Sequence, residues 1–203
     1  MTPAKRAMDV ILALALGAIL LPLGLVLAGA IVILSGRPVI YGSERMRAPG
    51  EGFRLLKFRT MRPDPGDTGV TGGDKADRIT PMGRVLRRTR LDELPQVWNV
   101  LMGDISFVGP RPPLRRYVEM FPDLYSRVLR ARPGITGLAT LTFHRHEEEL
   151  LSRAGTAEET EAIYVRRCVP RKARLDLIYA RNRTVCYDLM LLGRTVARVV
   201  RRR

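Results

Sequence analysis

The hydrophobic pattern divides the chain into an apolar N-terminal segment and a remainder of mixed polarity. From Val10 to Leu34 no side chain carries a charge, and Leu, Ala, Ile, Val and Gly dominate. About 20 apolar residues are enough to cross a bilayer as a helix. The run exceeds the ~7–15-residue core of a secretory signal, and no clear small-x-small cleavage site closes it. The pattern therefore predicts a membrane segment over residues 1–36.

A proline and the flanking charges favour a re-entrant hairpin over a single pass, which remains the alternative. Pro22 lies near the middle of the run, where it removes a backbone donor and bends a helix. Positive charge marks the cytoplasmic side of a membrane, and basic residues flank both ends: Lys5, Arg6, Arg37, Arg45 and Arg47. Each half of about 12 residues covers only ~18 Å of a ~30 Å hydrocarbon core. Asp9 either pairs with one of the first two cations at the interface or is favoured by the helix dipole.

Alternating polarity predicts two strands after this segment. Residues 39–41 form a short candidate, and residues 53–61 form the better one. In the second strand Lys57 and Arg59 alternate with apolar positions, so they share one face. That face is either solvated or turned toward phosphate. Residues 62–77 are rich in Gly, Asp, Pro and Thr, which predicts a mobile loop.

Two helices follow, joined by a pair of acids. Thr80 and Pro81 open a helix through about Arg90, and its cations recur at helical spacing, namely Arg84, Arg87 and Arg88. A second helix begins near Pro95, which suits a first turn, and ends at Gly103. This arrangement puts the acidic pair at the start of the second helix.

Asp92 and Glu93 allow two interpretations at that position. A carboxylate at a helix N-terminus commonly caps backbone donors. Alternatively, two adjacent acids among arginines form a site for a divalent cation and a diphosphate, because guanidinium groups bind phosphate and carboxylates bind hard cations. Prolines on both sides of Arg111 fix its backbone and direct its side chain, which indicates either a binding loop that presents a single cation or a structural turn.

The remaining segments carry weaker signals. Residues 132–137 form a tight turn that starts with a cation. His144 and His146 lack the other members of a metal set, and we interpret them as surface residues. The segment from Tyr187 to Arg203 is amphipathic, with apolar residues at helical spacing and many arginines. It lies in a membrane interface or packs on the domain core. We therefore divide the chain into residues 1–36, 37–186 and 187–203.

Composition and charge narrow the possible partners. The formal net charge is +15 over 203 residues, and nearly all of the excess lies outside the apolar segment. Such an excess favours nucleic acid, anionic lipid or a nucleotide-type substrate. Aromatic residues make up only 6% of the chain, so a stacking platform for nucleic acid is not apparent. Cys168 and Cys186 show no metal spacing and are expected to be free thiols.

Taken in order, the motifs closely resemble the bacterial sugar transferase family, the monotopic phosphoglycosyl transferases. The matching segments are Lys5-Arg6-x-x-Asp9, Lys57-Phe58-Arg59-Thr60-Met61, Arg78-Ile79-Thr80-Pro81-x-Gly83, Leu91-Asp92-Glu93-Leu94-Pro95-Gln96, Val108-Gly109-Pro110-Arg111-Pro112, Arg132-Pro133-Gly134-Ile135-Thr136-Gly137 and Asp176-x-x-Tyr179-x-x-Asn182-Arg183. Each motif is weak alone, but the ordered set spans almost the whole chain and is specific.

The resemblance implies a ping-pong transfer of sugar-1-phosphate from a UDP-sugar to polyprenyl (undecaprenyl) phosphate. Asp92 would be the nucleophile, Glu93 would complete the dyad with Mg²⁺, and UMP would leave. The product would be a polyprenyl diphosphate sugar, the first membrane intermediate of glycoconjugate or polysaccharide synthesis. A carboxylate can attack phosphorus when a metal and cations offset charge repulsion.

The resemblance also assigns the other site residues, the fold and the location. Candidates for binding the phosphates are Lys57, Arg59, Arg87, Arg88 and Arg111, and further active-region candidates are Arg145 and Asp176. The family's hairpin usually has Ser-Pro at its bend, where this chain has Leu21 and Pro22. We expect a helix-rich α+β protein with a re-entrant N-terminal helix, interfacial amphipathic helices and a small catalytic domain. It would lie on the cytoplasmic face of the bacterial inner membrane, in contact with anionic head groups.

A basic lipid-binding module without catalysis is the main rival. It explains the charge and the amphipathic segments but leaves Asp92 and Glu93 without a role. A membrane-tethered nucleic-acid binder is the second rival, and it lacks a recognisable motif. Magnesium-dependent release of UMP from a UDP-sugar separates both from the enzyme.

Overall fold

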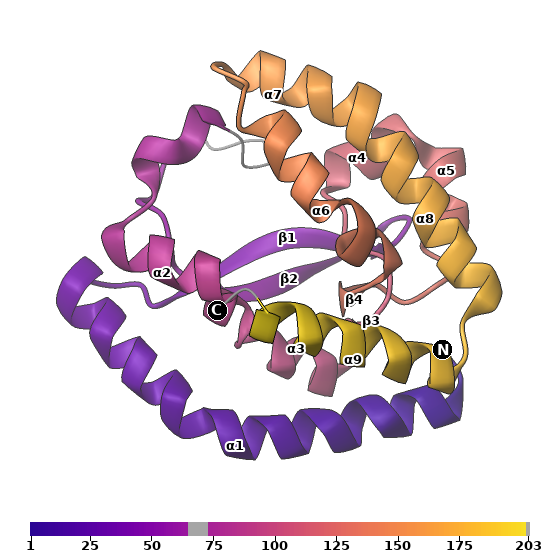
Figure 1. Cartoon of the computed structure of the whole chain (residues 1–203), viewed down its shortest axis with the longest axis horizontal. Helices are drawn as coiled ribbons and strands as arrows, with labels where there is room; N and C mark the ends of the chain where they lie inside the picture. The colour runs from indigo at the N-terminus through magenta and orange to yellow at the C-terminus, as the bar shows by residue number, and fades with distance from the viewer. Residues whose placement is uncertain (65–72, 202–203) are drawn as a thin grey trace.

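The computed structural model describes residues 1–64 and 73–201 and shows a helix-rich α+β protein (Figure 1). Its elements in chain order are α1 (Pro3–Ser35), β1 (Ile40–Ala48), β2 (Glu51–Phe58), the 3-10 turn η1 (Gly73–Arg78), α2 (Pro81–Thr89), the 3-10 turn η2 (Leu91–Glu93), α3 (Gln96–Met102), β3 (Ser106–Val108), α4 (Arg115–Met120), α5 (Pro122–Val128), β4 (Gly134–Thr136), α6 (Leu138–Leu151), α7 (Ala157–Ile163), the π-helical turn η3 (Tyr164–Cys168), α8 (Val169–Asn182) and α9 (Val185–Arg201). The predicted fold class is confirmed at this level.

Helix α1 is one continuous helix through Pro22 and follows a curved path (Figure 1). Thr2 caps its start, because its side-chain oxygen accepts a hydrogen bond from the backbone N–H of Lys5 at 3.3 Å. Gly36 ends it with a φ of 74°, a left-handed conformation that favours glycine. Proline removes one backbone hydrogen bond and bends the helix that contains it. The expected bend is therefore compatible with an unbroken helix.

Both ends of α1 pack against the rest of the protein, whereas its middle does not. Near the start, Ala13 is buried in a cluster with Val100 and Leu191. Near the end, Leu27 and Ile31 pack against Leu86 and its neighbours. Between and beyond these contacts the helix exposes apolar side chains, including Ile11, Leu14, Ile19, Leu21, Leu25, Val26, Ile33 and Leu34. By length and composition α1 could cross a membrane, and only 11% of its most apolar stretch is buried in the protein.

Two small sheets lie beside the helices. β1 and β2 form an antiparallel hairpin, and the short strands β3 and β4 pair in parallel. The predicted strand at 39–41 is shorter than the observed β1. The predicted strand at 53–61 extends beyond β2, which ends at Phe58. After Phe58 the chain turns toward the start of α2, where the carbonyl oxygen of Thr60 accepts a hydrogen bond from the N–H of Thr80 at 3.0 Å.

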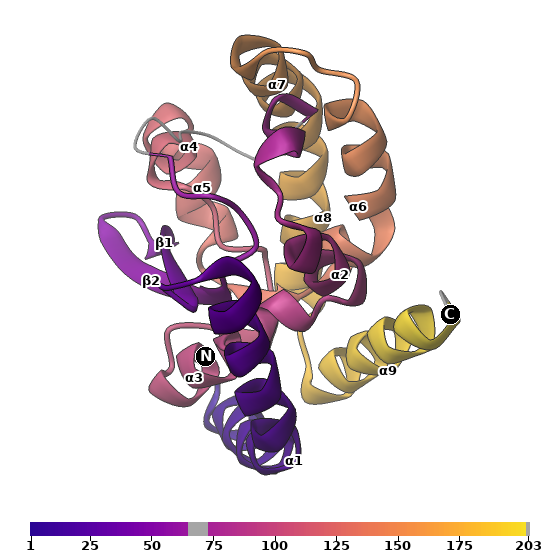
Figure 2. The same ribbon diagram turned by 90° about the vertical axis from the view of Figure 1, so that its left-hand side faces the viewer.

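A helical lobe formed by α4 to α8 lies on the side of the sheets away from α1 (Figures 1 and 2). Its core contains Tyr117, Phe143 and Tyr164 together with apolar residues of α5 and α8. Cys168 is buried in this core, Cys186 is exposed on α9, and both are free thiols as expected.

The C-terminal amphipathic helix packs on the core with one side and is exposed on the other. α9 begins at Val185, two residues before the predicted start, and the side chain of Thr184 accepts a hydrogen bond from the N–H of Tyr187 at 3.1 Å. Leu191 is fully buried, whereas Leu189 and Val196 are exposed. The core-packing alternative therefore holds for part of the apolar stripe.

The predicted loop over 62–77 is only partly described. Residues 65–72 lie outside the described residues, and Gly73–Arg78 forms the 3-10 turn η1.

Candidate active site

The junction between α2 and α3 presents the two acids. The side chain of Thr80 caps α2 by accepting a hydrogen bond from the N–H of Gly83 at 2.9 Å. At the other end Arg90 adopts a left-handed conformation, with a φ of 62°. This turn stops α2 and starts η2, which contains both acids. Pro95 then leads into α3, which ends at Gly103 as predicted.

Three cations from separate parts of the chain surround Glu93. Its Oε1 atom lies 3.0 Å from Nη2 of Arg111, 3.3 Å from Nη1 of Arg90 and 3.5 Å from Nζ of Lys57. Burial opposes ionisation, but the positive charges of Arg111, Lys57 and Arg90 outweigh it and lower the pKa of Glu93 to about 2. Glu93 is therefore a carboxylate at any physiological pH.

Asp92 lies beside this cage in a different environment. Its side chain is buried, and Oδ1 has no hydrogen-bond partner within the described part of the chain. Burial raises the pKa of Asp92 above its ordinary value, and the positive charge of Lys57 only partly offsets this effect. A desolvated carboxylate oxygen without a donor is poorly stabilised, which makes it a stronger nucleophile than a hydrogen-bonded one.

The charge on Lys57 depends on this environment. Burial and the nearby Arg111 lower the pKa of Lys57 to about 8, although Glu93 and Asp92 act in the opposite direction. Lys57 is therefore protonated at neutral pH but loses its proton in mildly alkaline solution.

The other predicted phosphate-binding residues do not all lie near the acidic pair. Arg87 is half-buried, its Nε atom donates to the side-chain oxygen of Thr60 at 2.9 Å, and its charge acts on Asp92. Arg88 is exposed on the next position of α2. Arg59 lies beyond the end of β2, and its guanidinium group donates to the carbonyl oxygens of Ser35 and Gly36 at the end of α1. The structure does not bring Arg59 to the acidic pair.

The two further candidates lie in the helical lobe. Arg145 is exposed on α6, while its neighbour His144 contacts the guanidinium group of Arg90. Asp176 is buried on α8, where desolvation raises its pKa to about 7 despite the charge of Lys172. Neither residue belongs to the cage around Glu93.

Sequence reasoning counted Arg90 among the arginines beside the acidic pair without selecting it as a phosphate-binding residue, and it missed Arg45. The charge of Arg45 acts on Lys57, and burial together with Arg111 lowers the pKa of Arg45 to about 10. Arg90 precedes Glu93 by three residues, a spacing that could have indicated the contact, whereas nothing in its local sequence marks Arg45.

The donor set suits a hard divalent cation. Mg²⁺ is commonly held by one or two carboxylates and completes its shell with water and substrate phosphate. Asp92 offers a buried oxygen without a protein donor, and Glu93 stays ionised. Among the described residues no group of three or more acids, histidines or cysteines could hold a metal ion, so a cation at this site would have only the two carboxylates as protein ligands.

The polar residues at the start of α1 do not pair as expected. Asp9 accepts hydrogen bonds from the side chain of Ser106 and the N–H of Phe107, and it is fully buried. Lys5 pairs with Asp188 instead. Asp9 does not pair at the interface, because the side of α1 that carries Lys5 and Asp9 is buried against the domain. A dipole effect also fades beyond the first turn of a helix.

Comparisons with known proteins place almost the whole chain in one family. The bacterial sugar transferase family matches residues 1–202. The UDP-glucose:undecaprenyl-phosphate glucose-1-phosphate transferase of Klebsiella pneumoniae is 33% identical over 95% of this chain and 39% of its own length. The protein of the same name from Caulobacter vibrioides is 36% identical over 95% of this chain and 68% of its own length.

A relative with a different sugar in its name is almost as similar. The UDP-N-acetylgalactosamine-undecaprenyl-phosphate N-acetylgalactosaminephosphotransferase of Aeromonas hydrophila is 31% identical over 97% of this chain and 43% of its own length. The chain thus spans about two fifths of the length of several of these relatives. Since the family match extends over nearly every residue, the chain belongs to the bacterial sugar transferase family.

Proposed function

We propose that this protein transfers a sugar-1-phosphate from a UDP-sugar to undecaprenyl phosphate, with release of UMP. The observation that carries the proposal is the buried pair of acids at the α2–α3 junction, one caged by three cations and one with a free oxygen. The names of the relatives supply the reaction class and both substrates. A lipid-binding module has no need for an ionised glutamate at the centre of a partly buried cation cluster.

In the first half-reaction, Asp92 attacks the sugar-side phosphorus of the donor. A bond forms between a carboxylate oxygen and this phosphorus, and the bond from the phosphorus to the bridging oxygen breaks. UMP leaves with the bridging oxygen and its electron pair. Lys57 and Arg111 are placed to neutralise the phosphate oxygens, because positioning and charge stabilisation dominate phosphoryl transfer.

In the second half-reaction, a phosphate oxygen of the lipid attacks the same phosphorus. The bond to Asp92 breaks, the carboxylate is regenerated and the diphosphate of the product is complete. The attacking lipid phosphate is already an anion, so no general base is required. The burial that raises the pKa of Asp92 also excludes water, which would otherwise hydrolyse the acyl phosphate.

We further propose that Asp92 and Glu93 hold Mg²⁺. A bound divalent cation supplies positive charge that reduces the repulsion between a carboxylate and a diphosphate. Within the protein, Glu93 provides the permanently ionised ligand, and its cage of cations fixes its orientation.

We propose that α1 enters and leaves the bilayer on the cytoplasmic face of the inner membrane. Both ends of α1 pack on the same domain, through Ala13 near one end and Ile31 near the other. A single pass would put the two ends on opposite sides of the bilayer, where one cytoplasmic domain could not contact both. Apolar side chains are exposed between the two anchored ends, as a re-entrant segment requires. A site at this depth meets the lipid phosphate at the interface and the nucleotide sugar from water.

The reaction is tested by measuring UMP release. The full-length protein in membranes is incubated with undecaprenyl phosphate, Mg²⁺ and each member of a panel of UDP-sugars. We expect one or a few donors to release UMP, and the Asp92→Asn variant to release none while it still co-sediments with membranes. Intact-mass analysis without the lipid acceptor should show one added sugar phosphate on wild type alone.

Two outcomes would overturn the proposal. If no donor releases UMP while the protein binds anionic vesicles normally, the lipid-binding module is the better interpretation. If Asp92→Asn retains turnover, the covalent mechanism is wrong even if the reaction class holds.

The topology is tested with single cysteines at the two ends of α1. Ala4→Cys and Arg37→Cys are made separately in a Cys186→Ser background, which removes the exposed native thiol. In intact spheroplasts a membrane-impermeant maleimide should label neither position, and after lysis it should label both. Labelling of one position in intact spheroplasts would show a single pass.

A further inference from the structure

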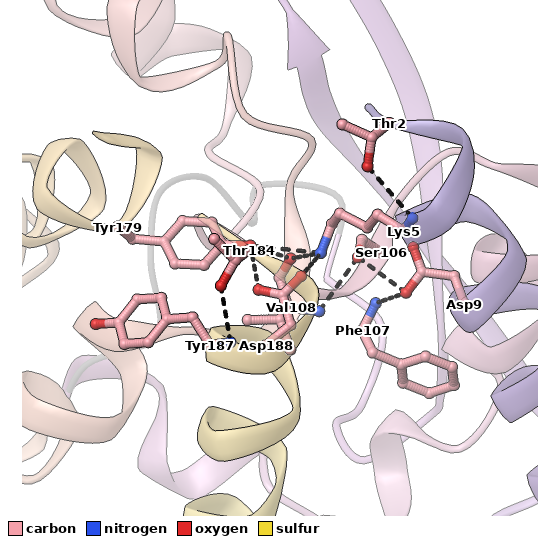
Figure 3. Close-up of polar contacts among 10 residues, drawn as sticks. All are labelled: Thr2, Lys5, Asp9, Ser106, Phe107, Val108, Tyr179, Thr184, Tyr187 and Asp188. Atoms are coloured by element: carbon pink, nitrogen blue, oxygen red, sulfur yellow. Dashed lines mark hydrogen bonds and ion pairs between the residues drawn. The ribbon is translucent and has the colours of Figure 1, made fainter. Parts of the chain in front are cut away.

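A buried polar cluster joins the first turns of α1 to β3, α8 and α9 (Figure 3). Its side chains are between 0% and 8% exposed, and they belong to Lys5, Asp9, Ser106, Tyr179 and Asp188. The proposed reaction gives these residues no chemical role. They contact β3, the strand that leads directly into the loop that carries Arg111, and this position suggests another function.

Two elements hold the carbonyl oxygen of Val108. The ammonium group of Lys5 donates to this oxygen at 3.0 Å and also pairs with the carboxylate of Asp188. The hydroxyl of Tyr179 lies 3.1 Å from the same oxygen and 2.7 Å from Oδ1 of Asp188. The last residue of β3 is therefore held by α1 on one side and by α8 on the other, with Asp188 of α9 connecting them.

Asp9 holds the two preceding residues of the same strand. Its Oδ1 atom accepts hydrogen bonds from the side chain of Ser106 at 3.0 Å and from the N–H of Phe107 at 3.2 Å. Side chains one turn apart on α1 thus contact three consecutive residues of β3. The strand has little freedom to shift relative to the membrane helix.

The chain between Val108 and Arg111 is equally constrained. The N–H of Gly109 donates to the carbonyl oxygen of Thr136 at 2.8 Å, and the carbonyl oxygen of Pro110 accepts from the N–H of Gly134 at 2.8 Å. A side chain at position 109 would place its Cβ atom 2.1 Å from a backbone oxygen, so only glycine fits. Because these hydrogen bonds tie Gly109 and Pro110 to β4, Val108 can shift only together with the paired strands and the loop that carries Arg111 to Glu93.

We propose that Lys5 is a positioning residue for the transfer reaction: with Tyr179 and Asp188 it fixes the carbonyl of Val108 and thereby holds Arg111 against Glu93. The membrane helix then has a second role besides anchoring, since its first turns keep the catalytic loop in register. This inference rests on the proposed function.

The composition of the cluster supports a role in geometry rather than in stability alone. Taking a lysine and an aspartate out of water is unfavourable, and a well-packed apolar pair at such a position is often at least as stable. Charged groups also fix orientation, because the ammonium group donates directional hydrogen bonds to Val108 and Asp188. An apolar pair could bury the same surface but could not fix a carbonyl.

A double-mutant cycle between Lys5 and Arg111 tests the proposal in membranes that contain the full-length protein. Lys5→Met should lower kcat/KM for UMP release about tenfold in the wild-type background. In an Arg111→Lys background, where the guanidinium contact with Glu93 is already lost, the same change should cost less than about twofold. Equal losses in both backgrounds would overturn the proposal.

Arg6→Met is the matched control. It removes the neighbouring positive charge of α1, whose guanidinium group donates to the carbonyl oxygens of Val100 and Leu101 instead of Val108. Its effect on kcat/KM should be the same in the wild-type and Arg111→Lys backgrounds. Coupling to Arg111 as large as that of Lys5 would mean that any loss of charge from α1 has this effect, contrary to the proposal.

A second variant separates positioning from folding. Lys5→Met alone leaves Asp188 buried without its partner, which destabilises the protein. Lys5→Met combined with Asp188→Asn removes both charges and should recover most of the thermal stability. Activity should stay low, because the Val108 carbonyl still lacks its ammonium donor. Recovery of wild-type activity would show that Lys5 acts through stability and would overturn the proposal.

These experiments distinguish failure of the proposed function from failure of the positioning role. If wild type releases no UMP from any donor, the reaction class is wrong. If wild type is active and the cycle is additive, only the positioning role is wrong.

Discussion

At the scale of single residues, the balance between burial and nearby charges gives two neighbouring acids different pKa values. Glu93 and Asp92 are adjacent, yet three cations lower the pKa of one while burial raises that of the other. Lys57 interacts with both carboxylates, and its own pKa is lowered to about 8. Such divergence within one cluster is typical of active sites, and it makes the pH dependence of the reaction a direct test of the site.

Replacing Lys57 by Arg should change the alkaline limb of the pH profile. The free enzyme needs the positive charge at this position, which wild type loses as the pH rises through about 8. We therefore expect kcat/KM for UMP release to fall above this pH in wild type, and the fall to move upward by at least one pH unit in Lys57→Arg, because arginine stays charged.

The matched control is Lys172→Arg. Burial disfavours the charge of Lys172, but Tyr164 and Glu147 outweigh it and raise its pKa. This variant should keep the wild-type alkaline limb. An unchanged limb in Lys57→Arg would show that another group titrates there.

Asp176 makes the stability of the protein depend on pH. Desolvation raises its pKa to about 7 in the folded state, against about 3.9 in an unfolded chain. Between these values the folded state binds more protons, so the free energy of unfolding decreases as the pH rises toward 7. Asp176→Asn removes this loss. Its melting temperature relative to wild type should be more favourable at pH ~8 than at pH ~5, and equal differences would contradict the assignment.

At the scale of elements, the amphipathic helix α9 packs on the protein with one side and is exposed on the other. Leu191 is fully buried beside Ala13 of α1, whereas Leu189 lies two positions earlier and is 49% exposed. The buried side ties the C-terminal helix to the membrane helix. The exposed side, with Met190 and Val196, is available to lipid.

Truncating these two leucines should reduce stability by very different amounts. Leu191→Ala leaves a cavity between α9 and α1 and should lower the free energy of unfolding by about 2–5 kcal/mol. Leu189→Ala changes an exposed position and should cost less than about 0.5 kcal/mol. Thermal unfolding in the same detergent measures both. Similar losses would mean that α9 does not pack as described.

At the scale of the whole molecule, basic residues gather beside the N-terminus of α1. A surface groove between α5 and α8 is lined by Arg127, Arg130, Arg181 and Arg183. Arg183 also lines a neighbouring pocket with Met1 and Thr2. Within the described residues none of the four forms an ion pair with a carboxylate. Because Arg183 is shared with the pocket at Met1 and Thr2, the groove lies close to the start of the expected membrane helix.

Neutralising the groove should weaken the preference for anionic lipid. Each arginine near an anionic surface contributes about 1 kcal/mol. Arg181→Gln with Arg183→Gln should therefore lower the partition ratio between phosphatidylglycerol-containing and neutral vesicles by roughly 30-fold at low salt. The matched control, Arg166→Gln with Arg167→Gln, removes the same charge from exposed positions in η3. Equal losses in both variants would show that net charge alone sets the preference.

The sequence determined the elements whose signals are local. The uncharged run that forms α1, the two helices around the acidic pair and the amphipathic α9 were all predicted, because periodicity and turn residues act over a few positions. The ordered motifs also indicated the family. Element ends were less accurate, as the end of β2 shows, since the chain leaves the strand to contact α2.

Only the tertiary structure decided which charged residues meet. Lys57 and Arg59 were predicted to share a strand face, yet one contacts Glu93 and the other binds the end of α1. Lys5 and Asp188 are separated by 183 positions and still form a buried pair. A local pattern shows which side of an element is polar, but partners and desolvation are set by whichever element packs against it. The chemistry of this site depends on those long-range contacts.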